Sequence, residues 1–200
     1  MQDIEFYYDF ASPNVFMVNA VLPKIAAKHG VSVIYKPMLL GGVFKATNNQ
    51  APMIAFSGVS HKLDYMRLEI ARFLRRYSVP FKMNPHFPVT TVAIMRGAVA
   101  SLGTEWEQSY FDTVMRALWI DGEKMDDPET IARVLGAAGL PVAEIIEKSQ
   151  SDSIKSTLRD MTEAAVARKV FGAPSMFVGD EMFFGKDSLD DLDWFLGQSS

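Results

Sequence analysis

The sequence of 200 residues contains no cysteine. Enzymes that exchange disulfides need a thiolate of their own to attack the substrate disulfide. Dithiol exchange by this chain is therefore excluded. Any thiol chemistry on this protein must use a sulfur that arrives with a bound ligand.

Several other signals are also absent. No apolar run approaches the ~20 residues that a membrane-spanning helix needs. The chain starts directly with a strand pattern, without a basic leader or cleavage site, so we expect a cytoplasmic protein. The net charge of −4 gives no electrostatic field for nucleic acid or an anionic membrane. The three histidines are scattered, and no metal-binding motif or phosphate-binding glycine loop is present, so we expect no metal and no nucleotide cofactor.

The clearest pattern lies at the start of the chain. A short aromatic and apolar run stops at Asp9, and Ser12 and Pro13 are then typical of the N-cap and the first residue of a helix. One stripe of this helix carries apolar residues, namely Val15, Val18, Leu22 and Ile25. Ser12 would thus lie at a strand-to-helix turn, where free N–H groups and the helix dipole favour a thiolate, phosphate or carboxylate. The simpler interpretation of an isolated Ser-Pro pair is a helix cap alone.

A second pattern lies near the other end, where Pro174 comes just before an apolar strand. A proline at this place has to be at the edge or the first residue of the strand, because it cannot donate a ladder hydrogen bond. It is also a plausible site for a cis X–Pro bond. The alternative is a rigid turn into the strand, which would need the same proline.

Periodicity along the chain predicts an α/β protein. Residues 3–9 and 31–35 are predicted strands that flank a helix at 13–29, which gives a parallel β-α-β unit. Residues 41–60 are rich in Gly, Asn and Pro and are predicted to form a mobile, exposed loop. Its apolar residues could cover a pocket or fill a gap at a domain junction; they are Met53, Ile54 and Phe56.

The rest of the chain alternates helical patterns with short connections. Helices are predicted at 61–77, 90–102 and 105–119, from 127, from 141 and at 153–168. Strands near 175–179 and 181–184 and a helix at 188–196 complete the set. We therefore expect a domain made of residues 1–39 and 166–200, interrupted by an all-helical insertion at 40–165.

Five short segments, spread in order over nearly the whole chain, resemble one known family. They are Phe6-Tyr7-Tyr8-Asp9-Phe10-Ala11-Ser12-Pro13, Lys62-Leu63-Asp64-Tyr65, Trp119-Ile120-Asp121-Gly122, Arg168-Lys169-Val170-Phe171-Gly172-Ala173-Pro174 and Phe184-Gly185-Lys186-Asp187. With them the chain resembles the DsbA-like branch of the thioredoxin superfamily, and within it the kappa-class glutathione transferases and 2-hydroxychromene-2-carboxylate isomerases. The resemblance implies a thioredoxin-like fold with an inserted all-helical domain, and a homodimer.

The resemblance also implies glutathione as the carrier of the missing sulfur. Ser12 would donate a hydrogen bond to this sulfur and so lower the pKa of the thiol. Ala173 and Pro174 would meet the cysteinyl part of glutathione through their backbone. Asp187 and Ser188 would meet the γ-glutamyl end, although a lysine stands at position 186 where the family has a small polar residue. The alternative for Asp187 is a cap of the last helix.

Two further residues are implied to bind the same tripeptide. Lys62 would meet the glycine carboxylate, and Asn49 would contact the peptide from a loop. Taken alone, a lysine on a helix face is usually solvated, and an asparagine in a loop is usually a turn former.

An aromatic substrate would lie against a further set of residues. These are Asn84, Phe87, Pro88 and Trp119. The segment around Asn84 departs from the isomerases, which carry arginines and an asparagine in this area. Aromatic residues at helical spacing, Trp119 included, are more often plain core.

The function that the resemblance implies is a glutathione-dependent isomerase that interconverts 2-hydroxychromene-2-carboxylate and trans-o-hydroxybenzylidenepyruvate in the degradation of naphthalene-type aromatics. A kappa-like transferase that conjugates glutathione to general electrophiles is the first alternative. A non-catalytic thioredoxin-like module that binds peptides or a partner helix is the second.

Overall fold

The computed structural model describes residues 2–198, and its centre is a four-stranded sheet with the order β2-β1-β3-β4. The strands are β1 (Ile4–Tyr8), β2 (Val33–Pro37), β3 (Ser175–Val178) and β4 (Glu181–Phe184). β1 pairs in parallel with β2, whereas the β1–β3 and β3–β4 pairs are antiparallel. The predicted β-α-β unit and the closing pair of strands are confirmed.

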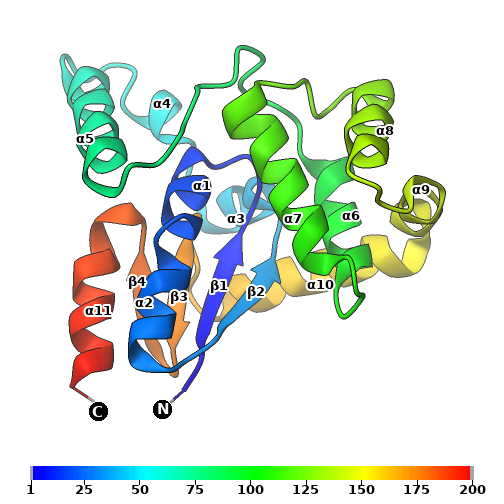
Figure 1. Cartoon of the computed structure of the whole chain (residues 1–200). Coiled ribbons are helices and arrows are strands. Elements are labelled where there is room, and N and C mark those ends of the chain that lie inside the picture. The colour runs from blue at the N-terminus through cyan, green and yellow to red at the C-terminus, as the bar shows by residue number, and fades with distance from the viewer. Residues whose placement is uncertain (1, 199–200) are drawn as a thin grey trace.

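Helices and the loops that connect them form the rest of the molecule (Figure 1). The α-helices are α1 (Pro13–Asn19), α2 (Leu22–His29), α3 (Leu40–Thr47), α4 (Pro52–Ala55), α5 (Lys62–Tyr77), α6 (Val92–Ser101), α7 (Glu107–Arg116), α8 (Pro128–Ala137), α9 (Val142–Gln150), α10 (Asp152–Ala167) and α11 (Leu189–Gly197). A π-helical turn, η1 (Ala117–Asp121), extends α7, and a 3₁₀ turn, η2 (Lys186–Ser188), leads into α11. Within residues 2–198, no helix combines the length and the apolar character that crossing a bilayer requires.

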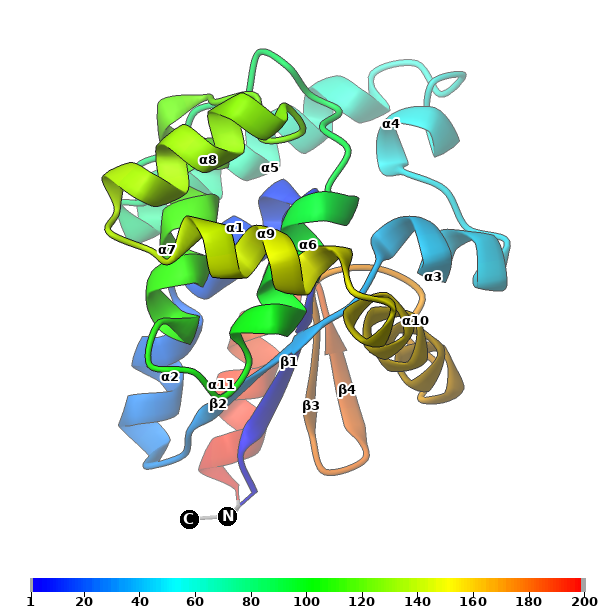
Figure 2. The ribbon, with the colours of Figure 1, turned by 90° about the vertical axis from the view of Figure 1, so that its right-hand side faces the viewer.

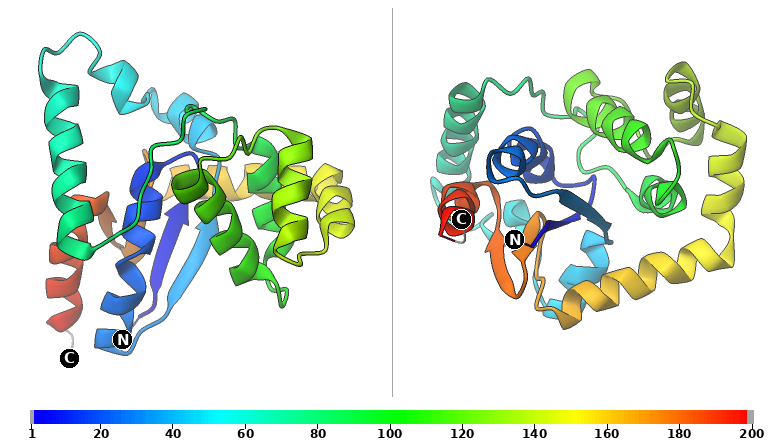
Figure 3. Two further views of the ribbon diagram at one scale, coloured as in Figure 1. Left: turned by 45° about the horizontal axis from the view of Figure 1, so that its top comes forward. Right: turned by 60° about the horizontal axis from the view of Figure 1, so that its bottom comes forward.

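The sheet is covered on both faces, which explains the composition of its central strand. Helices α2 and α11 lie on one side of the sheet and α10 on the other (Figures 2 and 3). Ile4, Phe6 and Tyr8 on one face of β1 are buried, and on the other face Tyr7 is buried while Glu5 is partly exposed. A strand between two layers has little solvent-exposed surface, so β1 is apolar or aromatic except at Glu5, which pairs with Arg168. The rings of Tyr8 and Phe111 on α7 meet edge to face, which joins the strand to the helical part of the chain.

The helix predicted at 13–29 is two helices, and this prediction is wrong in that respect. Pro23 lies in the first turn of α2. As a proline it could not donate to the carbonyl of Asn19, and its ring would clash with that carbonyl in a continuous helix. The chain therefore leaves the first helix at Asn19 and starts α2 at Leu22, with Gly30 in the left-handed conformation as the predicted end.

The prediction of an irregular loop at 41–60 is also wrong, because this segment contains α3 and α4. Gly41 and Gly42, which suggested a loop, lie in the first turns of α3. A Cβ on Gly42 would come within 3.0 Å of Cγ2 of Thr162 on α10, so glycine permits the close approach of the two helices. The same Thr162 hydroxyl accepts a hydrogen bond from the amide of Leu39. Met53 and Ile54 on α4 are mostly exposed.

The long helix α5 stands apart from the sheet and lies above α11 in the view of Figure 1. Phe73 is its only residue classed as buried. Arg76 near its end forms two hydrogen bonds with the carboxylate of Asp190 on α11, of 3.0 and 3.1 Å. α5 thus forms one wall of a pocket whose other wall includes η2.

All described strands lie outside residues 40–165, in keeping with the order of the predicted insertion. The two parts nevertheless share one hydrophobic core. α10, which lies in the predicted insertion up to residue 165, packs against β2 as well as against α3 and α6. The division into two domains therefore stays a prediction about chain order.

Close packing of α6 on α7 gives a test of this arrangement. A Cβ on Gly97 would lie 2.0 Å from the hydroxyl oxygen of Tyr110, which is buried and donates to the carbonyl of Ile94 at 2.8 Å. We expect Gly97→Ala to lower the free energy of unfolding by roughly 2–3 kcal/mol in urea titrations, because the gain in helix propensity is smaller than the cost of overpacking. The matched control is Gly136→Ala on α8, whose new Cβ would meet only Cγ2 of Val142 at 3.7 Å and which should be neutral or stabilising. Equal stability of the two variants would contradict the packing of Gly97 on Tyr110.

Candidate active site

Ser12 lies in the turn between β1 and α1, as predicted. It is the N-cap of α1, its Oγ accepts a hydrogen bond from the amide of Val15 at 3.4 Å, and Pro13 is the first helical residue. The same Oγ donates to the carbonyl of Ala173 at 3.0 Å. Ser12 is 6% exposed, so its hydroxyl faces a nearly closed corner.

The sheet brings Ala173 to this corner. Ser175 at the start of β3 pairs with Tyr7 near the end of β1, so the residues before β3 come to lie beside the turn that follows β1. The peptide bond between Ala173 and Pro174 is cis, which agrees with the prediction. Pro174 in turn accepts a hydrogen bond from the amide of Gly185 at 3.0 Å, and this connects the corner to η2.

A buried carboxylate supports the turn from behind. Asp9 is 1% exposed, and its oxygens accept hydrogen bonds from the amide of Ala11 at 2.9 Å, the amide of Leu40 at 2.7 Å and the hydroxyl of Thr91 at 2.7 Å. Burial raises the pKa of Asp9, and these hydrogen bonds only partly offset that rise. The carboxylate ties the β1–α1 turn to α3 and to the start of α6.

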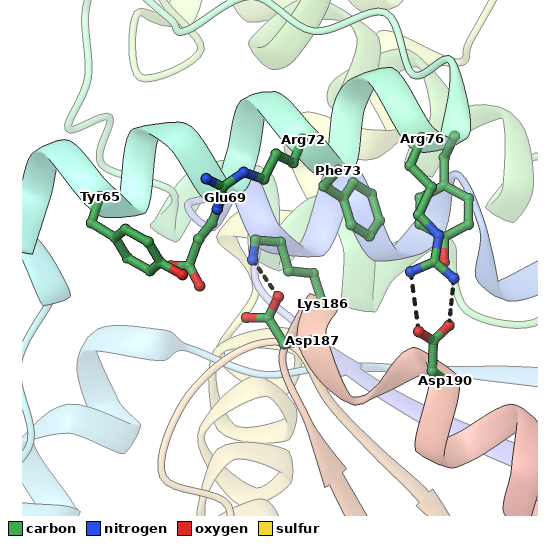
Figure 4. Close-up of a pocket in the computed structure, with 9 residues that line it drawn as sticks. Tyr65, Glu69, Arg72, Phe73, Arg76, Lys186, Asp187 and Asp190 are labelled. Atoms are coloured by element: carbon green, nitrogen blue, oxygen red, sulfur yellow. Dashed lines mark hydrogen bonds and ion pairs between the residues drawn. The ribbon is translucent and has the colours of Figure 1, made fainter.

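A pocket of about 300 Å³ opens between α5 and η2 (Figure 4). Its walls carry apolar, cationic and anionic side chains, and they are formed by Tyr65, Glu69, Arg72, Phe73, Arg76, Tyr77, Lys186, Asp187 and Asp190. Since η2 contacts α1 and follows Gly185, the pocket lies next to the Ser12 corner. The two features form one candidate site.

At η2, the alternative that Asp187 caps the last helix is wrong. The ammonium group of Lys186 pairs with the carboxylate of Asp187, and the lysine side chain is buried while that of Asp187 is mostly exposed. Asp187 does not cap α11, since the N-cap is Ser188 and makes no capping bond with its side chain. The Ser188 hydroxyl donates instead to the carbonyl of Gly185 at 3.0 Å.

Asn49 directly follows the C-cap of α3, and Lys62 is the first residue of α5. The Asn49 amide nitrogen donates to the carbonyl of Phe171 at 2.8 Å, which holds the residue near the segment that leads to Ala173. The Lys62 ammonium lies 5.4 Å from the centre of the Phe56 ring, at the start of α5. The structure thus places Asn49 against the segment that leads to Ala173, and Lys62 one turn before Tyr65 on the helix that forms the pocket wall.

The residues predicted for the substrate pocket divide into two kinds. Trp119 is 1% exposed, and its indole nitrogen donates to the carbonyl of Phe10 at 3.1 Å. Asn84 is buried as well: its amide nitrogen donates to the carbonyls of Leu118 and Glu123, and its oxygen accepts from the amide of His86. This environment favours the plain-core alternative for Trp119, and the side chain of Asn84 is engaged with backbone groups.

Phe87 and Pro88 retain open surface. Phe87 is half-buried, with its ring centre 6.0 Å from that of Trp119, and Pro88 is exposed. The peptide bond between them is cis. They are the members of the predicted substrate set that a ligand can reach.

Sequence reasoning missed Asp9 and, apart from Asp187, the residues that line the pocket. Asp9 was noted only as the end of a strand, and its burial depends on donors from distant segments. Glu69 and Arg72 carry a local signal, because they lie on the same helical face as Tyr65 and Phe73. Which face of α5 meets η2 is a tertiary property that spacing alone does not give. In the part of the chain that the structure describes, no three His, Asp or Glu side chains come together as metal ligands.

Comparison of the sequence with known proteins identifies relatives of this chain. A model of the DsbA-like thioredoxin domain matches residues 3–197. A 2-hydroxychromene-2-carboxylate isomerase of Pseudomonas sp. strain C18 is 32% identical to the chain over 189 residues, which cover 93% of the chain and 86% of that protein. Glutathione S-transferase kappa 1 of Rattus norvegicus is 26% identical and covers 98% of the chain and 91% of its own length.

A solved structure shows the same fold. The crystallised 2-hydroxychromene-2-carboxylate isomerase superposes on the chain with a TM-score of 0.84 at 29% identity, over 98% of this chain and 95% of that one. The predicted thioredoxin-like fold with additional helices is confirmed.

The environment of Asp9 yields a pH-dependent prediction. Thr91→Val removes one of the donors to the carboxylate, and Thr91 does not cap α6 with its side chain, so the change is confined to this contact. We expect the free energy of unfolding near neutral pH to fall by roughly 1–3 kcal/mol in urea titrations. Thr90→Val is the matched control, since Thr90 is exposed and only its backbone amide contacts Asp126.

The sign of the pH effect follows from the raised pKa of Asp9. The folded protein holds this proton more tightly than the unfolded chain, so stability falls as pH rises from the ordinary Asp value of 3.8 through the raised folded value. Loss of the Thr91 donor raises the folded pKa further and extends this window to higher pH. The deficit of Thr91→Val should therefore shrink when the titration is repeated in acid. A deficit that is independent of pH would contradict the role of an ionised Asp9.

Proposed function

The chain belongs to the family of DsbA-like thioredoxin domains, in the branch of 2-hydroxychromene-2-carboxylate isomerases and kappa-class glutathione transferases, and on this premise we propose that it is a glutathione-dependent isomerase. Its proposed reaction interconverts 2-hydroxychromene-2-carboxylate and trans-o-hydroxybenzylidenepyruvate in the degradation of naphthalene-type aromatics. Relatives at about 30% identity support an enzyme of this isomerase and transferase branch. The dependence on glutathione and the place in a naphthalene-type degradation pathway are the parts of this function that we propose.

The observation that supports glutathione best is the Ser12 corner in a chain without cysteine. A hydroxyl stands at the N-terminus of a helix, beside the carbonyl that precedes a cis-proline. Pro13 has no N–H, and Ser12 accepts from the amide of Val15, which leaves the amide of Asn14 as the first-turn donor for a ligand. A hydroxyl and a backbone amide are donors that stabilise a thiolate.

The hydrogen bond between Ser12 and Ala173 suggests how the corner exchanges partners. A hydroxyl has one proton, and in this structure Ser12 gives it to the Ala173 carbonyl. To donate to a sulfur, Ser12 has to turn away from that carbonyl. The carbonyl of Ala173 is then available to accept the cysteinyl N–H of the peptide, in the manner of an added strand. One bond inside the protein is thus replaced by two bonds to the ligand.

Glutathione, when bound, would supply a thiolate that adds to the conjugated double bond of the substrate; opening of the ring C–O bond of the hemiketal would then permit rotation about the resulting single bond, and expulsion of the thiolate would restore the double bond and return glutathione unchanged. The chain's own residues would bind the glutathione and orient its sulfur. Ser12 and the Asn14 amide would keep the sulfur ionised near neutral pH, and Ala173 and Pro174 would fix its direction.

The other proposed contacts follow the placement of the side chains. Asp187 and Ser188 would lie at the γ-glutamyl end of the tripeptide, and Asn49 and Lys62 at its glycine end. For the substrate we propose that Phe87 and Pro88 supply the accessible apolar surface. Asn84 and Trp119 would shape this surface from behind, because both are buried and engaged with backbone carbonyls. The protein would work in the cytoplasm, and it would form a homodimer, as its resemblance to the family implies.

A kappa-like glutathione transferase is the second candidate, and the kappa-class relatives at 22–28% identity favour it. The same Ser12 corner would serve both reactions. Turnover of 1-chloro-2,4-dinitrobenzene beside that of the chromene substrate separates them. Absence of any heat on titration with glutathione would instead favour the non-catalytic binding module.

Removal of the Ser12 hydroxyl tests the proposal. We expect Ser12→Ala to raise the pKa of the thiol of bound glutathione by about one unit or more, read from the ultraviolet absorbance of the thiolate. Isomerase turnover with saturating glutathione should fall by roughly a hundredfold, as when a donor to a developing anion is lost. The free energy of unfolding should drop by only about 1–2 kcal/mol, the value of a helix cap.

Ser151→Ala is the matched control, because Ser151 caps α10 through the amide of Ile154 in the same way but lies outside the site. It should cost similar stability and leave both turnover and the thiol pKa unchanged. A Ser12→Ala variant with parental turnover and an unaltered thiol pKa would falsify the proposed role of the hydroxyl.

A further inference from the structure

Two side chains from the predicted helical insertion hold the turn between β1 and α1. Phe10 in this turn is 0% exposed, so its peptide groups need partners inside the protein. Its amide donates a hydrogen bond to the sulfur of Met95 on α6 at 3.5 Å. Its carbonyl accepts a hydrogen bond from the indole nitrogen of Trp119 in η1 at 3.1 Å. Both peptide groups of one turn residue are thus bound by side chains that are distant in the sequence.

The neighbouring amides of the turn are paired locally. The amide of Ala11 donates to the carboxylate of Asp9, and the amide of Ser12 donates to the carbonyl of Asp9. Ser12 lies only two residues after Phe10, and planar peptide bonds leave two rotatable backbone bonds per residue. A rotation at Phe10 therefore moves the residues that follow it, and the position of the Ser12 hydroxyl depends on bonds that the turn alone does not make.

Trp119 is itself fixed by its surroundings. Its carbonyl accepts a hydrogen bond from the amide of Lys82 at 2.8 Å, and its ring stacks on that of Phe81 with the centres 5.9 Å apart. The turn η1 that carries it is π-helical, and turns of this kind are frequent at functional sites. Its ring also packs near that of Phe87, at 6.0 Å between centres. Trp119 therefore connects the surface proposed for the substrate with the turn that carries Ser12.

We propose that Met95 and Trp119 are positioning residues, which bind the peptide groups of Phe10 and thereby fix the place of the Ser12 hydroxyl. Both side chains are buried, so they act through Phe10 and not on a ligand. Trp119 has the larger effect, because an indole N–H is a full donor whereas a thioether sulfur is a weak acceptor. That the fixed hydroxyl acts on the sulfur of glutathione rests on the proposed function.

The test uses two variants that remove one bond each. Trp119→Phe removes the indole N–H and keeps an aromatic ring, and Met95→Leu removes the sulfur at nearly constant volume. Both are made in the wild type and in Ser12→Ala, and urea titrations establish that each protein is folded under the assay conditions. Two quantities are measured: the pKa of the thiol of bound glutathione, and isomerase turnover with saturating glutathione and substrate.

With Ser12 in place, we expect Trp119→Phe to raise the thiol pKa and to lower turnover about tenfold, because a displaced donor no longer meets the sulfur. Met95→Leu should act in the same direction, by about threefold in turnover. In Ser12→Ala, both substitutions should change turnover by less than about twofold, since the group that they position is gone. Equal factors in the two backgrounds would show an effect that does not pass through Ser12, and the proposal would be wrong.

A crystal structure of Trp119→Phe without ligand gives a result that does not depend on the reaction. We expect the Phe10 carbonyl to change direction, and the distance from Ser12 Oγ to the carbonyl oxygen of Ala173, which is 3.0 Å in the wild type, to exceed hydrogen-bonding length. An unmoved turn with this bond intact would overturn the proposal. If the turn moves but the wild type neither binds glutathione nor converts the chromene substrate, the positioning role stands and the proposed function is wrong.

Trp106→Phe is the matched control. Trp106 precedes α7 and is half-buried, with its ring centre 6.1 Å from that of Tyr110, and its indole nitrogen has no hydrogen-bond partner within residues 2–198. This variant should leave turnover, the thiol pKa and the bond between Ser12 and Ala173 unchanged. A loss as large as that of Trp119→Phe would mean that the effect does not come from the bond to Phe10.

Discussion

The hydrogen bond from the Ser12 hydroxyl to the Ala173 carbonyl joins two parts of the chain that are 161 residues apart, and the candidate site exists only where they meet. The antiparallel pairing of β1 with β3 produces this meeting, because Tyr7 opposite Ser175 brings the turn after β1 beside the turn before β3. Each partner is itself fixed by local chemistry. A serine followed by proline starts α1, and a cis-proline turns the chain into β3. The hydrogen bond joins two atoms that are close in space, but the register of the sheet determines whether it can form.

The helical part of the chain holds the same corner from behind. Asp9 binds the amide of Leu40 at the start of α3 and the hydroxyl of Thr91 before α6. The indole of Trp119 binds the carbonyl of Phe10, one residue further along the turn. The inserted helices thus act on the position of Ser12 without touching it.

Local signals in the sequence were sufficient to predict the Ser12 corner. They were insufficient to predict the residues of the pocket next to it. The N-cap at Ser12 and the cis bond at Pro174 depend on adjacent residues, and both predictions are confirmed. The break of the first helix was also a local matter, since Pro23 cannot continue it, and the apolar stripe concealed this signal. By contrast, Gly42 suggested a loop because its close approach to α10 is a tertiary contact. The set of charged side chains in the pocket on α5 likewise depends on which helix face meets η2, which no spacing in the sequence indicates.

The central claim is that a hydroxyl bound to the protein in the free state becomes the donor to a sulfur from outside. A crystal structure of the protein with glutathione bound tests it most directly. The account predicts that Ser12 Oγ lies within hydrogen-bonding distance of the glutathione sulfur, and that the carbonyl of Ala173 accepts the cysteinyl N–H in its place. A sulfur that lies elsewhere, with the bond between Ser12 and Ala173 intact, would contradict the account.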